Sequence, residues 1–311
     1  MNSSNSKLFR VSSWLAASIV SLSIGVSAYA ASSINVQHAS GNTKVSVEPK
    51  TVVVYDLATI DTLHALDDDI QGVPDTPWPE FLSQYKDVNR YKTIGTLFEP
   101  DYEAVNSMQP DLIIVAGRSA PKYRSLSRIA PTIDLTVDPA NLLDSVRKNV
   151  QILGEIFNKS ELAQKKMDEI DGYVASVNNF KSDGSGLIVL TTGGKMSAYG
   201  PGSRFGMVHD ILGVEPVAKD LSTSNHGQAI SFEFIFKNDP DWLFVIDRDA
   251  AIEMQGESAK RLLDNSLIHK TKAWNNNNIV YLNPSDWYLL GSAGLDSLQN
   301  SINEVANAIR Q

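Results

Sequence analysis

The chain has 311 residues and no cysteine; 42% of its residues are hydrophobic, 20% are charged, and the formal net charge is −9. This length is enough for about two lobes with sizeable cores. The lack of cysteine excludes disulfides, thiolate nucleophiles and thiolate metal ligands, and the acidic charge disfavours nucleic acid and anionic lipid as partners.

The first thirty residues have the order of an export signal. Lys7 and Arg10 precede an apolar run that ends in Ala28-Tyr29-Ala30. A positive region, an apolar stretch and an A-x-A site are typical of a secretory signal peptide, and the run is shorter than the roughly 20 residues of a spanning helix. We expect residues 1–30 to be removed after Ala30, which would change the net charge from −9 to −11.

The next part of the chain predicts a lobe of alternating strands and helices. Alternating polarity over residues 34–47 predicts a β-hairpin. Short apolar runs predict strands at 51–56, 92–95, 111–117 and 131–136, with helical patterns between them. This alternation is typical of a parallel sheet covered by helices on both faces. We assign residues 31–140 to an N-terminal α/β lobe.

We predict a helical connector over residues 141–183, because these residues have helical periodicity and no strand pattern. The turn Asn158-Lys159-Ser160 should divide the connector into two helices. Residues 184–311 form a C-terminal α/β lobe, with strands predicted at 186–192, 241–247 and 278–283 and a last helix at 294–309. The predicted fold class is therefore α/β, with two lobes that each contain a mainly parallel sheet flanked by helices, joined by a long helical connector.

Each lobe contains a copy of one sequence unit. Residues 101–120 align with residues 231–250 without a gap, at an offset of 130. The identical pairs are Glu103 and Glu233, Pro110 and Pro240, Asp111 and Asp241, Val115 and Val245, Arg118 and Arg248, and Ala120 and Ala250. A helix, a Pro-Asp pair, a buried strand and an arginine therefore recur in both lobes.

Arginines follow the strands of this repeat. Arg118 and Arg248 come at the carboxyl ends of equivalent strands, where parallel α/β sheets bind ligands, and Arg204 lies in a glycine-rich segment expected to be a loop. A single arginine is more often a solvated residue or an ion-pair partner, but three at one edge favour an anion-binding cleft. Asp247 and Asp249 flank Arg248 and would either orient it or neutralise it.

Other candidate residues lie on loops and helix starts. His226, in a polar loop, and Tyr288, after the last strand, offer an imidazole and a phenolate that suit Fe(III). Glu103 and Glu233 lie near equivalent helix starts and are either a docking pair for a basic partner or ordinary surface glutamates. His209 is expected to be an ordinary helix residue.

Enzyme motifs are incomplete. The sequence contains no phosphate-binding loop, no G-x-S-x-G elbow and no H-E-x-x-H pair. An exported hydrolase that uses His226 with an acidic partner is therefore a remote alternative. We expect a protein that is not an enzyme.

Several segments together resemble a known family. SAYGPGSRFGMVHDILGV and IVYLNPSDWYL, with PDLIIVAGR and PDWLFVIDR, are similar to segments of the periplasmic ferric-siderophore-binding proteins of ABC importers, also called class III or cluster A-II binding proteins. The likeness is greatest to the catecholate-siderophore group, which is CeuE- and VctP-like, and it covers essentially the whole mature chain. It implies two lobes around a shallow cleft, no intrinsic cofactor, and a ferric siderophore as the ligand.

The resemblance also implies roles for individual residues. Arg118, Arg204 and Arg248 would lie beneath the chelate, and His226 and Tyr288 would complete the coordination of Fe(III) by tetradentate siderophores only. In the same family, the glutamates that match Glu103 and Glu233 engage arginines of the permease.

The expected partners are a ferric catecholate siderophore of the enterobactin or vibriobactin type (or its hydrolysis products), the inner-membrane ABC permease and its ATPase. The missing lipobox cysteine departs from several relatives and predicts a protein that is soluble in the periplasm. We also expect the protein to be a monomer. A haem or cobalamin carrier on the same scaffold is the alternative, with His226 and Tyr288 as axial ligands.

Overall fold

A computed structural model of the protein describes residues 1, 32–178, 184–256 and 258–310. The predicted signal peptide and its cleavage site after Ala30 lie almost entirely outside these residues. No helix in the described part is both long and apolar enough to cross a membrane. The fold is described here for the unit that begins at Ser32.

The first described lobe is built on five parallel strands in the order β5-β4-β3-β6-β7. Their bounds are β3 (Val52–Val54), β4 (Gly72–Asp75), β5 (Lys92–Thr96), β6 (Leu112–Val115) and β7 (Thr132–Asp134). An antiparallel hairpin, β1 (Ser33–His38) and β2 (Gly41–Ser46), joins the edge of β7, where the Ala39 N–H donates to the carbonyl of Asp134. The predicted hairpin and the four predicted strands are confirmed, whereas β4 was not predicted.

The sheet of the second lobe is mixed. In the described residues its strands have the order β11-β9-β8-β12-β13, and β10 pairs with β8. Their bounds are β8 (Ser185–Thr192), β9 (Lys195–Tyr199), β10 (Glu215–Pro216), β11 (Gln228–Ile230), β12 (Trp242–Asp247) and β13 (Ile279–Leu282). The strands β10, β8, β12 and β13 are parallel, and β9 runs antiparallel to both β8 and β11. The prediction of mainly parallel sheets is confirmed.

The strand β9 corrects the expectation of a glycine-rich loop. Gly193 and Gly194, with φ of 52° and 74°, form a two-residue turn between β8 and β9, and Thr192 pairs with Lys195 across it. Two residues with positive φ suit a tight hairpin, for which a Gly-Gly pair is a known signal. Arg204 therefore follows β9 rather than β8.

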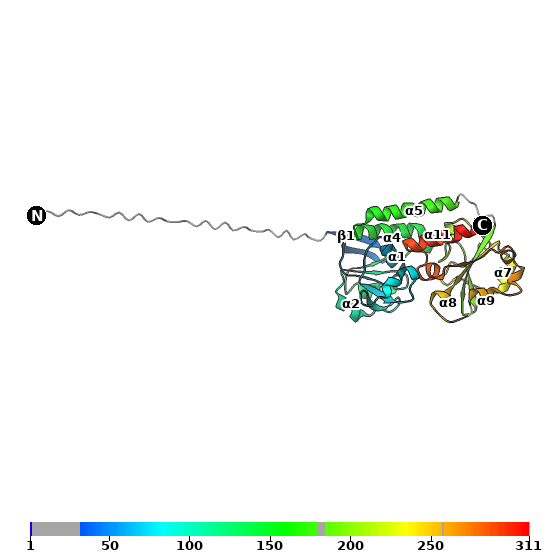
Figure 1. The fold of residues 1–311 in the computed structure, drawn as a ribbon, viewed down its shortest axis with the longest axis horizontal. Helices are drawn as coiled ribbons and strands as arrows, with labels where there is room; N and C mark the ends of the chain where they lie inside the picture. The colour runs from blue at the N-terminus through cyan, green and yellow to red at the C-terminus, as the bar shows by residue number, and fades with distance from the viewer. Residues whose placement is uncertain (2–31, 179–183, 257, 311) are drawn as a thin grey trace. The chain divides into compact units, whose positions relative to one another are not determined.

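Long helices connect the lobes. α4 (Leu142–Ile156) and α5 (Ser160–Asn178) fall within the predicted connector, and Asn158, with φ of 55°, lies in the break between them, as predicted. The last helix, α11 (Leu295–Ile309), packs against α5 and also against α1 (Leu57–Ala65) of the first lobe (Figure 1).

The remaining helices are short and cover the sheets or shape the loops. They are α1 (Leu57–Ala65), η1 (Glu80–Lys86), α2 (Tyr102–Met108), η2 (Ala120–Lys122), α3 (Tyr123–Leu126), η3 (Pro139–Asn141), α6 (Met207–Asp210), α7 (Phe232–Asn238), α8 (Arg248–Ala251), α9 (Ala259–Leu263), η4 (Ile268–Lys270), α10 (Lys272–Asn275) and the π-helical turn η5 (Ser285–Leu289). His209 is a buried residue of α6 whose Nδ1 lies 2.7 Å from the carbonyl of Val214, so it is a helix residue, as expected.

Successive strand residues enter different cores because side chains alternate across a sheet. Val52 and Val54 of β3 and Phe244 of β12 belong to one large core, which also contains residues of α4, α5 and α11. Val53 lies in a separate core under α2 and α3, and Leu243 lies in another under α7 and α9. Sheets with both faces covered explain why these strands read as continuous apolar runs.

The sequence repeat is also a structural repeat. The pair α2 and β6 and the pair α7 and β12 begin at positions 130 residues apart. Gln109 and Asp239 end the two helices in the left-handed conformation, with φ of 49° and 46°. Asp111 then accepts the backbone N–H of Thr51 just before β3, and Asp241 accepts that of Ser185 at the start of β8. Equivalent capping and strand alignment thus place an arginine after β6 and after β12.

Candidate functional site

The π-helical turn η5 presents Tyr288 beside a buried anchor. Trp287 is fully buried, and its indole Nε1 donates a 3.0 Å hydrogen bond to Glu304 of α11. This bond fixes the turn against the last helix. The neighbouring Tyr288 is half-buried.

Three guanidinium groups from separate segments of the chain converge on Tyr288. Arg118, from the first lobe, donates to the carbonyls of Tyr288 (2.8 Å) and Leu289 (2.9 Å). Arg204 donates to the same Tyr288 carbonyl at 2.8 Å, and the Nε of Arg248 donates to the Tyr288 hydroxyl at 2.8 Å. The guanidinium carbons lie 5.6, 4.6 and 5.6 Å from the centre of the phenol ring, within the range of cation–π attraction. The structure therefore brings four of the five predicted ligand-binding residues together.

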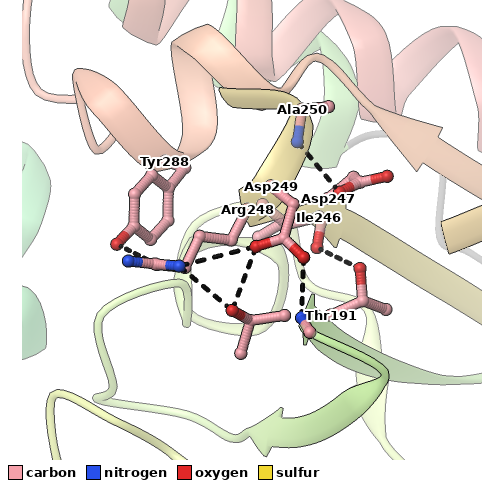
Figure 2. A network of polar contacts seen from close by, with 9 residues as sticks. Thr191, Ile246, Asp247, Arg248, Asp249, Ala250 and Tyr288 are labelled. Atoms are coloured by element: carbon pink, nitrogen blue, oxygen red, sulfur yellow. Dashed lines mark hydrogen bonds and ion pairs between the residues drawn. The ribbon is translucent and has the colours of Figure 1, made fainter. Parts of the chain in front are cut away.

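The surroundings of Arg248 explain its flanking aspartates (Figure 2). Its Nη1 donates to Thr192 Oγ1 at 3.1 Å and lies 3.5 Å from Asp249 Oδ1. Asp247 is engaged elsewhere, since it accepts the backbone N–H groups of Ala250 and Ala259 and caps α8. Asp249 is thus the flanking aspartate that faces the guanidinium, which the sequence left open.

The cluster shifts the pKa of Tyr288 and the pKa of Arg204. Burial alone would raise the pKa of the Tyr288 phenol, but the Arg248 hydrogen bond and the charges of Arg248, Arg204 and Arg118 together lower that pKa below its ordinary value. Burial lowers the pKa of Arg204, and the neighbouring charge of Arg118 lowers it further. The site thus favours negative charge on whatever lies among the guanidinium groups.

The loop that carries His226 is anchored near this cluster, although His226 itself is exposed. The Tyr199 hydroxyl donates to the carbonyl of Asn225 at 3.5 Å, and the charge of Arg204 acts on the Tyr199 phenol. Gly227, with φ of 64°, packs so closely on β9 that a Cβ there would lie 2.7 Å from the carbonyl of Ala198. Among the described residues, no hydrogen bond or ring contact links His226 to Tyr288.

The two predicted docking glutamates occupy equivalent exposed positions. Glu103 is the second residue of α2 and Glu233 is the second residue of α7. A hydrogen bond from Ser231 lowers the pKa of Glu233. Neither side chain belongs to the arginine cluster.

Two hollows in the described part of the chain, of about 340 and 580 Å³, lie along β13, and Asn277 and Ile279 line both. Their lining residues include none of the arginines of the cluster and not Tyr288. The arginine-lined cleft therefore stays a prediction.

Comparisons with known proteins cover both lobes. Residues 52–285 match the model of the periplasmic binding protein family. The chain is 39% identical over 284 residues to the petrobactin-binding protein YclQ of Bacillus subtilis, with 89% of each chain covered. It matches the crystal structure of YclQ with a TM-score of 0.87, over 90% of this chain and 99% of that one.

Two further relatives come from Vibrio. The ferric-anguibactin-binding protein FatB of Vibrio anguillarum is 36% identical over 278 residues, which cover 88% of this chain and 86% of FatB. The periplasmic catecholate-siderophore binding protein VctP of Vibrio cholerae is 27% identical, with a TM-score of 0.84 over 89% of this chain and all of VctP. These matches confirm the two-lobe α/β fold class and the resemblance predicted from the motifs. The chain therefore belongs to the periplasmic binding protein family, and it is a binding protein rather than an enzyme.

Proposed function

We propose that this protein captures a ferric siderophore of the catecholate type at the cluster of Arg118, Arg204, Arg248 and Tyr288 and delivers it to an inner-membrane ABC importer. The observation that carries the proposal is the convergence of three guanidinium groups on one phenol. The names of YclQ, FatB and VctP, which bind siderophores, support the ligand class.

The charge of the cluster suits this ligand. Three catecholate dianions around Fe(III) leave a net charge of 3−, spread over phenolate oxygens. Arginine is always protonated, weakly hydrated and able to donate several hydrogen bonds to such oxygens. Part-buried guanidinium groups offset the negative charge more strongly than exposed ones, because water and salt screen them less. The acidic exterior then disfavours nonspecific anions.

Tyr288 supplies a second kind of contact. A tetradentate bis-catecholate leaves two iron sites open, and a phenolate is a hard anionic ligand that Fe(III) favours. The lowered pKa of Tyr288 makes loss of its proton easier. We propose Tyr288 as one ligand and His226 as the other, with the exposed His226 turning toward the chelate on binding. Hexadentate siderophores would fill all iron sites and need neither residue.

Tryptophan fluorescence tests the function directly, because Trp287 adjoins Tyr288 in the chain. The mature protein is titrated with ferric enterobactin, ferric petrobactin and a ferric bis-catecholate, and in parallel with ferric citrate, a ferric hydroxamate, haem and cobalamin. We expect quenching at nanomolar concentrations by at least one ferric catecholate, and weak or no response to the iron-free ligand. Tight binding of haem or cobalamin with no response to ferric catecholates would refute the proposal.

A further inference from the structure

Asp249 is a buried carboxylate next to the arginine cluster. Its side chain is only 8% exposed. Oδ2 accepts a 2.6 Å hydrogen bond from the backbone N–H of Gly193, and Oδ1 accepts one of 3.2 Å from the hydroxyl of Thr192. The carboxylate is therefore held between the start of α8 and the turn that joins β8 to β9.

A line of hydrogen bonds runs from Asp249 to Tyr288. Thr192 donates to Asp249 and accepts from Arg248 Nη1, and Arg248 Nε donates to the Tyr288 hydroxyl. Arg248 thus lies between a carboxylate on one side and a phenol on the other (Figure 2). A guanidinium with both of these contacts has less freedom to rotate than one that reaches into solvent.

We propose that Asp249 is a specificity-determining residue, which orients Arg248 and, through its own charge, lowers the preference of the site for the most highly charged chelates. This inference rests on the proposed function. A ferric tris-catecholate carries a charge of 3−, whereas Fe(III) with two catecholate dianions carries 1−. One fixed negative charge opposes the first about three times as strongly as the second. Because Asp249 is buried, salt screens this effect less than that of an exposed carboxylate.

Two other aspartates lie near the arginines but have different contacts. Asp56 caps α1 in the first lobe and is within reach of the charge of Arg118, and Asp247 caps α8. Backbone N–H groups hold both carboxylates. Asp247 is therefore a suitable control, since Asp247→Asn removes a neighbouring charge and leaves the contacts of Arg248 in place.

The test compares two ligands with each variant. Dissociation constants are measured for ferric enterobactin, charge 3−, and for a ferric linear bis-catecholate, charge 1−, in the wild type and in Asp249→Asn. Loss of orientation changes the two affinities by different factors, because Arg248 acts on both chelates through its charge and contacts Tyr288, which we propose as a ligand of the bis-catecholate alone. Its effect on the ratio of the affinities is therefore measured separately, with Thr192→Val. Relative to that variant, we expect the ratio in Asp249→Asn to shift toward ferric enterobactin by about tenfold. Asp249→Ser is a second variant. Serine also lacks the charge, and its hydroxyl can still accept a hydrogen bond near Gly193.

Thr192→Val separates orientation from charge. It removes the hydroxyl between Arg248 and Asp249 without changing the charge of the site. We expect it to weaken the binding of both ligands, and its ratio of affinities is the reference for the two Asp249 variants. Asp247→Asn should leave the ratio within about twofold of the wild type. The same ratio in both Asp249 variants as in Thr192→Val, or a shift from it toward the bis-catecholate, would overturn the inference. If the wild type binds neither ligand, the proposed function itself fails, which is a different result.

Discussion

Arg118→Ala is the most informative single change, because Arg118 joins the two lobes. Arg118 lies in the first lobe, and its guanidinium donates two hydrogen bonds to main-chain carbonyls of η5, at Tyr288 and Leu289. Alanine removes both donors and one of the three positive charges around the phenol ring. The variant should therefore weaken both the contact between the lobes and the affinity for an anionic ligand.

The magnitudes follow from these contacts. A hydrogen bond from a charged donor contributes about 1.5–3 kcal/mol, and the partial exposure of Arg118 favours a combined loss of about 2 kcal/mol for the pair. In a protein of this size, that lowers the melting temperature by about 4 °C. For a trianionic chelate about 7 Å away, at an effective dielectric constant of about 40, one lost charge costs about 3.6 kcal/mol, or roughly 400-fold in affinity.

Two assays measure these effects. Thermal unfolding gives the stability change, and fluorescence titration with a ferric catecholate at about 0.05 and 1 M salt gives the affinity. The loss of affinity should be larger at low salt, where charges are less screened. Arg124→Ala is the matched control, since Arg124 is an exposed arginine of α3 in the same lobe. Equal affinities for the Arg118 and Arg124 variants at both salt concentrations would refute the reasoning.

Three other changes test separate features. Tyr288→Phe removes the hydroxyl that Arg248 contacts; it should shift the charge-transfer band of a ferric bis-catecholate complex and spare that of a hexadentate one, and two unchanged spectra would exclude Tyr288 as a ligand. Burial and the charge of Glu304 raise the pKa of Asp286 to about 7. The contribution of protonated Asp286 to the free energy of unfolding is therefore complete below about pH 4 and is lost as the pH rises through 7. The melting temperature should therefore fall less between pH 5 and 8 in Asp286→Asn than in the wild type, and an equal fall contradicts this. The double variant Glu103→Gln/Glu233→Gln should leave siderophore affinity unchanged and reduce uptake through the importer at least twofold. The control Glu161→Gln on α5 should not reduce uptake. Normal uptake by the double variant would argue against docking of these glutamates on the permease.

Much of the site could be predicted from two features of the sequence. The repeat at an offset of 130 implied that Arg118 and Arg248 follow equivalent strands, and strand ends of a parallel sheet share an edge. Tyr288 was found by the same rule, since it follows β13. The prediction that Arg204 lies in a loop directly after β8 was wrong, because β9 comes between them. The Gly-Gly pair was taken as part of that loop, although it is also a hairpin signal.

The contacts within the site could not be predicted in the same way. Arg118 and Arg204 bind a main-chain carbonyl, and a backbone acceptor leaves no trace in residue types. Thr192 was placed within a strand, where nothing indicated that its hydroxyl faces Arg248. The position of His226 depends on how its loop packs. Gly227 of this loop contacts Ala198 of β9, and such a tertiary contact cannot be read from local sequence patterns.

The acceptors of Arg118 have a consequence for how such proteins diversify. Every amino acid has a main-chain carbonyl, so a substitution at position 288 or 289 keeps the link between the lobes. The side chain that we propose as an iron ligand can then change while the main chain that holds it remains the same. Descendants of this protein can therefore acquire a new iron ligand, or lose one, by a single substitution that leaves the joint between the two halves in place.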